Sequence, residues 1–80
     1  MSKQELADKL TKLTINLEAL KNEQKELEGL KKTAEDNQEY DQADAFQELI
    51  QRNLSSQQKL KELITEVQDE IEGAGRQNGI

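Results

Sequence analysis

The sequence predicts an all-α protein, an antiparallel two-helix coiled-coil hairpin that dimerises into a four-helix bundle. Three observations carry this prediction: two heptad series of mostly apolar residues, a phase break between them, and the lack of any proline inside either series. Because each series alternates steps of four and three, it keeps one stripe on one side of an α-helix. This pattern drives helices to wrap around a partner helix. We call each stripe a seam.

The two seams are out of phase with each other. The first seam consists of Leu6, Leu10, Leu13, Leu17, Leu20, Gln24, Leu27, Lys31 and Ala34. The second seam consists of Ala43, Phe46, Ile50, Asn53, Gln57, Leu60, Ile64, Val67, Ile71 and Ala74. Continuing the first seam would place residues at Gln38, Asp41 and Ala45, two positions away from the second seam. Coiled coils absorb insertions of three or four residues, so a phase change of two indicates a turn between the seams.

Composition agrees with a single small helical domain. The chain has 80 residues, of which 35% are charged, with one Phe, one Tyr and no Trp. This composition alone would also suit a disordered chain, but the regular seams decide in favour of helices. Only Gly29 interrupts the first 72 residues, and no proline occurs anywhere. Without cysteine the chain has neither a disulfide framework nor a thiolate metal site.

Capping and turn signals predict the bounds of the hairpin, which covers residues 1–73. Ser2 followed by Glu5 is a capping box, so helix one is expected over about 3–35. Asp and Asn side chains compete for backbone N–H groups, and they predict a turn at about 36–38.

Helix two is then expected over about 39–73. Gly73 begins a glycine-rich stretch that favours a helix end. Residues 74–80 are expected to form a flexible tail.

Folding the chain at Asn37 predicts which residues face each other. Leu10 is then expected opposite Ile64. The polar seam residues fall within one stretch of the rod, namely Gln24, Asn53 and Gln57. Amides inside a coiled-coil seam fix the register of the helices at some cost in stability. We therefore predict a polar layer halfway along the hairpin.

Apolar residues outside the seams are the reason to expect self-association. They are Ile15, Leu30, Leu49, Leu54 and Leu63. Two helices cannot cover all of them, and a widened apolar face is what helices in four-helix bundles need. We predict that these residues form the face that binds a second copy or another partner. On the alternative interpretation, the chain is a structural or assembly subunit that uses these leucine faces and not the tip of the hairpin, the stretch 34–48 around the turn.

Negative charge is concentrated around the turn. The net charge of the chain is −6, and the stretch 34–48 holds six acids without Lys or Arg: Glu35, Asp36, Glu39, Asp41, Asp44 and Glu48. Acids near the start of helix two partly reflect the positive end of its dipole. The other explanation of these acids, which we predict, is a docking surface for a protein with a basic surface. Nucleic acid is not expected as a partner, because no basic stripe is present to replace phosphate counterions.

These features predict a non-enzymatic protein–protein interaction module, an adaptor or regulator with an acidic tip. Both aromatic residues lie in the same part of the sequence as the acids. The predicted protein-binding residues are Glu39, Tyr40, Asp41, Asp44, Phe46 and Glu48.

The tip resembles the UVR motif over about residues 27–54. The resemblance rests on Leu30, Ala34, Glu39, Tyr40, Asp41, Gln42, Ala43, Phe46, Glu48 and Ile50. The UVR motif is a helical hairpin that joins subunits in nucleotide-excision repair and occurs in adaptors and regulators of protease chaperones. The resemblance implies that acids face the partner while apolar residues pack the tip. Those packing residues would be Tyr40, Ala43, Phe46 and Ile50. The chain departs from the motif at Asp44, where the family has Ala, and at Gln47, where it has Arg.

The hairpin as a whole has a second resemblance. Small, acidic, cysteine-free helical hairpins of this length are similar to the secreted or chaperone-like partners of bacterial type VII secretion. Tyr40 and Asp44 form a Tyr-x-x-x-Asp pair of the kind that those proteins carry. The pair usually follows the second helix, whereas here it opens that helix.

No residue pattern predicts catalysis, a cofactor or a metal site. The chain has no His or Cys, and its Ser and Thr residues have no positioned base. The acids near the turn do not match a calcium loop with its central Gly and terminal Glu. No apolar run reaches the roughly 18 residues of a membrane span, and residues 1–10 lack the apolar core of a signal peptide. We therefore expect a cytoplasmic protein that does not bind membranes.

Overall fold

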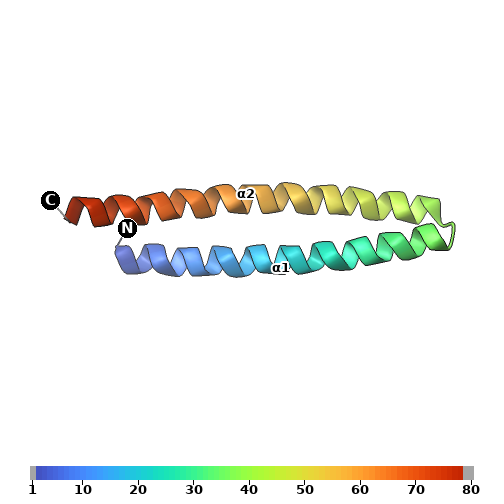
Figure 1. Cartoon of the computed structure of the whole chain (residues 1–80), viewed down its shortest axis with the longest axis horizontal. Coiled ribbons are helices and arrows are strands. Elements are labelled where there is room, and N and C mark those ends of the chain that lie inside the picture. The colour runs from blue at the N-terminus through green and yellow to red at the C-terminus, as the bar shows by residue number, and fades with distance from the viewer. Residues whose placement is uncertain (1, 79–80) are drawn as a thin grey trace.

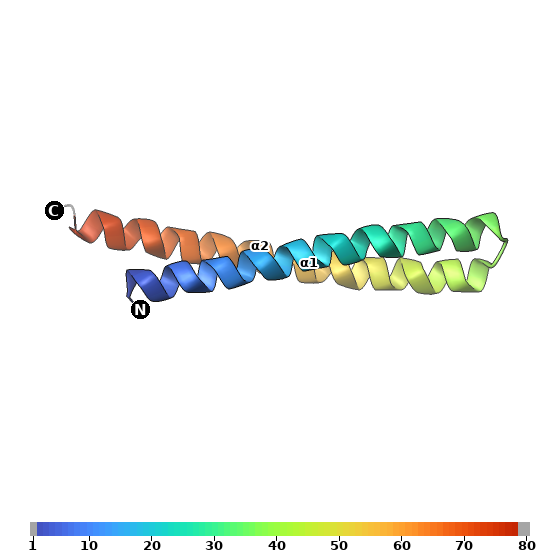
Figure 2. The ribbon, with the colours of Figure 1, turned by 90° about the horizontal axis from the view of Figure 1, so that it is seen from below.

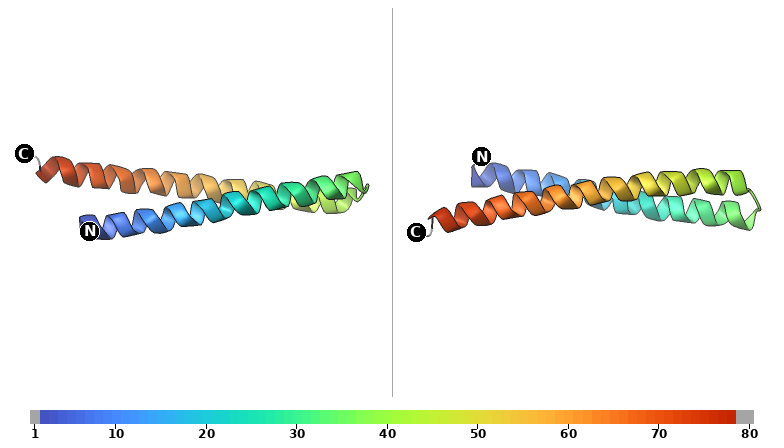
Figure 3. Two further views of the ribbon diagram at one scale, coloured as in Figure 1. Left: turned by 60° about the horizontal axis from the view of Figure 1, so that its bottom comes forward. Right: turned by 90° about the horizontal axis from the view of Figure 1, so that it is seen from above.

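The computed structural model describes the backbone of residues 2–78 and the side chains of residues 2–73. Two helices, α1 (Lys3–Asp36) and α2 (Tyr40–Asn78), run antiparallel and pack along their length (Figure 1). They cross in the views of Figures 2 and 3, as expected when two helices wrap around each other. The Cα atoms span 63 × 14 × 14 Å, so the molecule is a thin rod with the turn at one end. The predicted all-α helical hairpin is confirmed.

The start of α1 follows from its cap. Ser2 has extended backbone angles, and its side chain accepts a hydrogen bond of 3.1 Å from the backbone N–H of Glu5. Its backbone oxygen accepts from the N–H of Leu6 at 3.0 Å, which opens the helical hydrogen-bond series. A capped N-terminus satisfies donors that the helix itself leaves unpaired. The predicted start at Lys3 is confirmed.

Burial follows the two predicted seams. Every seam residue from Leu6 to Ile71 is buried or half-buried. Within residues 2–73, only Gln47 and Gly73 are half-buried without belonging to a seam. The side chain of Ala74 lies outside the described part of the chain. The heptad spacing therefore predicted the buried face of both helices.

The predicted polar layer is present. Gln57 and Asn53 are each only 4% exposed. The Gln57 Nε2 group donates to Gln24 Oε1 at 2.8 Å and to Asn53 Oδ1 at 2.6 Å. The Asn53 Nδ2 group donates to the backbone oxygen of Leu20 at 3.0 Å and to Glu23 Oε1 at 3.4 Å. These bonds tie the middle of α1 to the middle of α2 and offset the cost of burying two amides.

The register of the helices differs from the prediction by about one helical turn. Leu10 was expected opposite Ile64, but it lines a shallow surface depression with Gln68 and Ile71. Pairing the seams outward from Ala34 and Ala43 places Leu10 in the layer of Val67. The prediction was wrong because it centred the turn on Asn37, whereas the turn lies further along the chain.

The turn occupies residues 37–39 instead of the predicted 36–38. The Gln38 N–H donates to the Glu35 oxygen at 3.0 Å, and the Glu39 N–H donates to the Ala34 oxygen at 2.8 Å. These two bonds form a Schellman motif, which needs a left-handed residue after the helix cap. Gln38 takes that conformation with a φ of 61°. A residue with a Cβ atom pays about 1–2 kcal/mol for it.

We expect Gln38→Gly to stabilise the hairpin, because glycine adopts a positive φ without steric cost. The expected gain is about 0.5–1 kcal/mol in the free energy of unfolding, measured by denaturant titration. Gln51→Gly is the matched control, since Gln51 is an exposed residue inside α2 and should lose about 1 kcal/mol. Equal effects of the two changes would contradict the role of Gln38.

The helix α2 continues through Gly73 to Asn78, so the predicted end at Gly73 is wrong. Gly73 has no positive φ, and a Cβ atom added there would meet nothing within 4 Å. A glycine lowers helix stability by about 1 kcal/mol, and its preference for helix ends comes from the left-handed conformation, which Gly73 does not adopt. The backbone is helical over residues 74–78, while residues 79–80 and the side chains of 74–80 lie outside the described part. The predicted flexibility of this tail stays a prediction.

Candidate protein-docking surfaces

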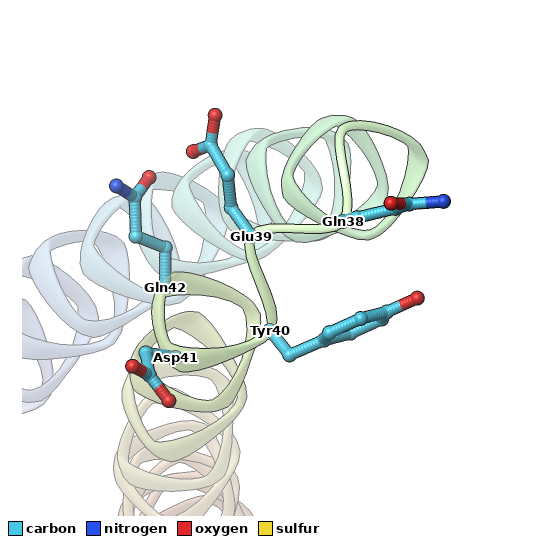
Figure 4. Close-up of a pocket in the computed structure, with 5 residues that line it drawn as sticks. All are labelled: Gln38, Glu39, Tyr40, Asp41 and Gln42. Atoms are coloured by element: carbon cyan, nitrogen blue, oxygen red, sulfur yellow. The ribbon is translucent and has the colours of Figure 1, made fainter.

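The tip of the hairpin presents Tyr40 on an open surface. A shallow depression there is lined by Gln38, Glu39, Tyr40, Asp41 and Gln42 (Figure 4). The ring of Tyr40 points away from both helices, on the same side as Gln38, whereas Glu39 and Gln42 project to another side. Tyr40 is 62% exposed. An aromatic side chain held at the end of a helix in this way is available for contact with another protein.

All six acids of the tip are exposed. Asp41 stands in the first turn of α2, where the helix dipole favours a negative charge. Asp44 and Glu48 follow on the outer side of the same helix. The structure therefore keeps five of the predicted binding residues at the surface: Glu39, Tyr40, Asp41, Asp44 and Glu48.

Phe46 and Tyr40 do not occupy the places expected for them. Phe46 is half-buried in the seam, so it supports the tip from within instead of forming part of the acidic contact. Tyr40 was expected to pack the tip on the UVR resemblance, but it is exposed. Ala43 and Ile50 are buried, as that resemblance implies.

Two flanks of the rod can be distinguished by heptad position. With the seam positions labelled a and d, e residues lie beside a and g residues lie beside d. Lys31 at an a position donates to Gln47 at an e position, at 2.6 Å. Asn53 at a d position donates to Glu23 at a g position. In an antiparallel pair, the e positions of both helices lie on one side of the rod and the g positions of both helices lie on the other side. We name these sides the e flank and the g flank.

The five apolar residues outside the seams are exposed, but they do not form one face. They lie in three places around the rod. Leu30, Leu49 and Leu63 occupy g positions and lie on the g flank. Leu54 occupies an e position on the opposite flank, and Ile15 projects from the outer side of α1. The predicted partner face is therefore divided, and the g flank holds most of it.

The described residues hold no group of three or more His, Cys, Asp or Glu side chains able to bind a metal ion. Within the same residues, no helix is both long and apolar enough to cross a membrane. No buried side-chain nitrogen or oxygen of the described part lacks a hydrogen-bond partner.

No family model, curated protein or solved structure matches this chain. The resemblances to the UVR motif and to type VII secretion partners therefore stay predictions.

Proposed function

We propose that this chain is a non-enzymatic interaction module, an adaptor or regulator whose acidic tip docks on the basic surface of a partner protein. One observation carries the proposal: Tyr40 is 62% exposed among acids that no nearby Lys or Arg balances in sequence. A tyrosine supplies contact area at a low entropy cost, and such residues often anchor protein interfaces.

The acids and the rod have complementary parts in this function. Exposed charges at the rim of an interface raise the association rate and reject partners of the same sign. The seams and the polar layer hold the tip at the end of a rod whose Cα atoms span 63 Å. A partner can therefore reach the tip without contacting the middle of the hairpin.

The test is affinity capture with a variant of the tip. We expect Tyr40→Ala with Glu39→Lys and Asp41→Lys to lose the proteins that the unchanged chain captures, as identified by mass spectrometry. These residues are exposed, so the hairpin should stay helical by circular dichroism. The two lysines reduce the net charge of residues 34–48 from −6 to −2, and Tyr40→Ala removes the aromatic anchor.

A control variant makes the same types of change elsewhere. Ile15 is 62% exposed, as Tyr40 is, and Glu62 and Asp69 are exposed acids of α2. The variant Ile15→Ala with Glu62→Lys and Asp69→Lys should retain the captured proteins. Equal recovery with both variants would contradict docking through the tip.

The second candidate is a structural or assembly subunit, favoured by the exposed leucines of the g flank. On this view Ile15→Glu with Leu63→Glu abolishes assembly or partner binding, while charge changes at the tip have no effect. The same capture experiment separates the two candidates, because each predicts loss with a different variant.

A further inference from the structure

We propose that the g flank binds a second copy of this chain, with both tips at the same end of a four-helix bundle. The two copies are related by a two-fold axis parallel to the rod, so that α1 of each copy packs on α2 of the other. This inference goes beyond docking through the tip, and it holds or fails independently of that function.

The apolar part of the contact is widest near the tip, and Leu63 adds a separate leucine further along the flank. Leu30 is 50% exposed and Leu49 is 43% exposed. The seam layers pair Leu27 with Ile50 and Lys31 with Phe46, and both leucines lie between these layers. Phe46 at its d position leans toward the same flank and is half-buried. In the proposed dimer each Leu30 meets Leu49 of the other copy, and apolar area leaves water at both places.

Charges along the flank match in this arrangement. The c positions lie next to g on the helix surface and form the rim of the contact. At equal heights, Glu26 of one copy lies across from Arg52 of the other, and Lys12 lies across from Glu66. At g positions, which lie closer to the middle of the contact than the rim does, Lys9 of one copy lies across from Glu70 of the other. All six residues are exposed in the hairpin and occur twice in the dimer. Opposite charges across a rim favour one orientation over others.

The opposite orientation brings like charges together. If α2 packed antiparallel on α2 of the second copy about Ser56, Arg52 would meet Lys59 of that copy. In the same arrangement α1 would pack on α1, and Glu23 would meet its own counterpart. Like charges in direct opposition are unfavourable. The charge pattern therefore selects tips at the same end.

The acids of the tip do not oppose this orientation. The acids inside the helices of the tip occupy e, f and b positions, namely Glu35, Asp36, Asp41, Asp44 and Glu48. On the g flank the same part of the rod carries only uncharged residues outside the seams: Leu30, Thr33, Gln42, Ala45 and Leu49. The acids thus face outward on both copies and remain available to partners.

The e flank is less suited to this contact. Apart from Tyr40 at the start of α2, Leu54 is its one large apolar residue outside the seams among residues 2–73, and Lys21 lies across from Leu54 at the same height. Burying an unpaired lysine head group costs free energy. Leu54 is therefore the matched control for the leucines of the g flank.

The first test is the solution mass of the chain, measured by light scattering after size exclusion over a concentration series. We expect twice the 9.1 kDa mass of the chain, and a return to the single mass for Leu30→Glu with Leu49→Glu. Leu54→Glu should remain a dimer. Circular dichroism of all variants checks that the helices are retained. A monomeric parent chain, or a leucine variant that remains dimeric, would overturn the proposal.

The second test is a charge exchange across the contact. Glu26→Lys or Arg52→Glu alone should weaken dimerisation by about threefold to tenfold, because each pair occurs twice. The two changes together should restore the affinity of the parent chain. Weakening that adds up in the double variant would contradict the pairing of these residues.

The third test distinguishes the orientation. The chain has no cysteine, so Asp36→Cys accepts a single spin label on each copy. With the tips at the same end, the labels lie at equal height and are separated by the width of the bundle, about 30 Å. In the opposite orientation about Ser56, they are a further 40 Å or so apart along the rod. A separation above about 45 Å would overturn the proposed axis.

The two proposals fail in different experiments. The variant Leu30→Glu with Leu49→Glu leaves the tip unchanged, so it should still capture the partner of the tip. The variant with Tyr40→Ala, Glu39→Lys and Asp41→Lys should remain a dimer.

Discussion

Ile50→Asp should unfold the hairpin, whereas Leu54→Asp should leave it folded. The two residues lie one turn apart on α2, and they differ in burial: Ile50 is 6% exposed and Leu54 is 40% exposed. A carboxylate at residue 50 would lose its water inside the seam, where Leu27 of the facing layer offers no hydrogen bond. The expected loss exceeds about 4 kcal/mol, which approaches the whole stability of a small domain.

Thermal unfolding followed by circular dichroism measures this difference. Ile50→Asp should have little helical signal even at low temperature, because isolated helices with mixed sequences are marginal in water. Leu54→Asp should melt within a few degrees of the parent chain. Leu54 lies outside the proposed dimer contact, so it also controls for self-association. Equal melting of the two variants would contradict burial of the second seam inside the hairpin.

The burial of these two residues was predictable because heptad spacing is a geometric constraint. A residue three or four positions from a seam residue returns to the same side of the helix, whatever the composition of the rest. Asn53 and Gln57 obeyed this constraint although they are polar, and they are as buried as their apolar neighbours. Their position on the helix determines their burial, and their hydrogen bonds offset the free-energy cost of burying the amides.

The position of the turn was harder to predict. Asn37 and Gln38 both suit a turn, and the left-handed conformation is more favourable for Asn. The structure nevertheless places Gln38 in it and leaves Asn37 at φ −88°. The facing seams decide this choice, because Ala34 and Ala43 must meet across the turn. Pairing the residues of the two seams, starting from Ala34 and Ala43, predicts the observed register. Turn-forming residues alone do not predict it.

Closeness in sequence groups Phe46 with the acids of the tip, but it does not predict which side of the helix each residue faces. Phe46 belongs to the second seam, so its half-burial follows from the same spacing that predicts the fold. The exposed leucines show the same effect, since Leu54 and Leu63 are close in sequence but lie on opposite flanks. Leu54 occupies an e position and Leu63 occupies a g position, and this difference in heptad position places them on different flanks. The identity of a partner has no comparable geometric signal in the chain.

Replacing the polar layer should raise the stability of the hairpin and lower its uniqueness. In Asn53→Leu with Gln57→Leu, two buried amides give way to apolar groups, as in the rest of the seam. The expected gain is about 1–3 kcal/mol in the free energy of unfolding, measured by denaturant titration. Without the bonds from Asn53 to Leu20 and from Gln57 to Gln24, Gln24 has no amide partner on α2, and apolar residues at 53 and 57 fit several registers. Sedimentation should then show a mixture of association states where the parent chain shows one.

The single variant Gln57→Leu should behave in the opposite way. It removes the donor to Asn53 Oδ1 and leaves that buried oxygen without its 2.6 Å hydrogen bond. An unpaired buried acceptor costs about 1–3 kcal/mol, so this variant should be less stable than both the parent chain and the double variant. Gln51→Leu with Gln58→Leu is the control, since both glutamines are exposed on α2 and their replacement adds apolar area outside the layer. It should change stability by less than about 0.5 kcal/mol and leave one association state. If the double variant also kept a single state, register would be set by the turn and the apolar layers, and the amides would be tolerated without specifying the fold.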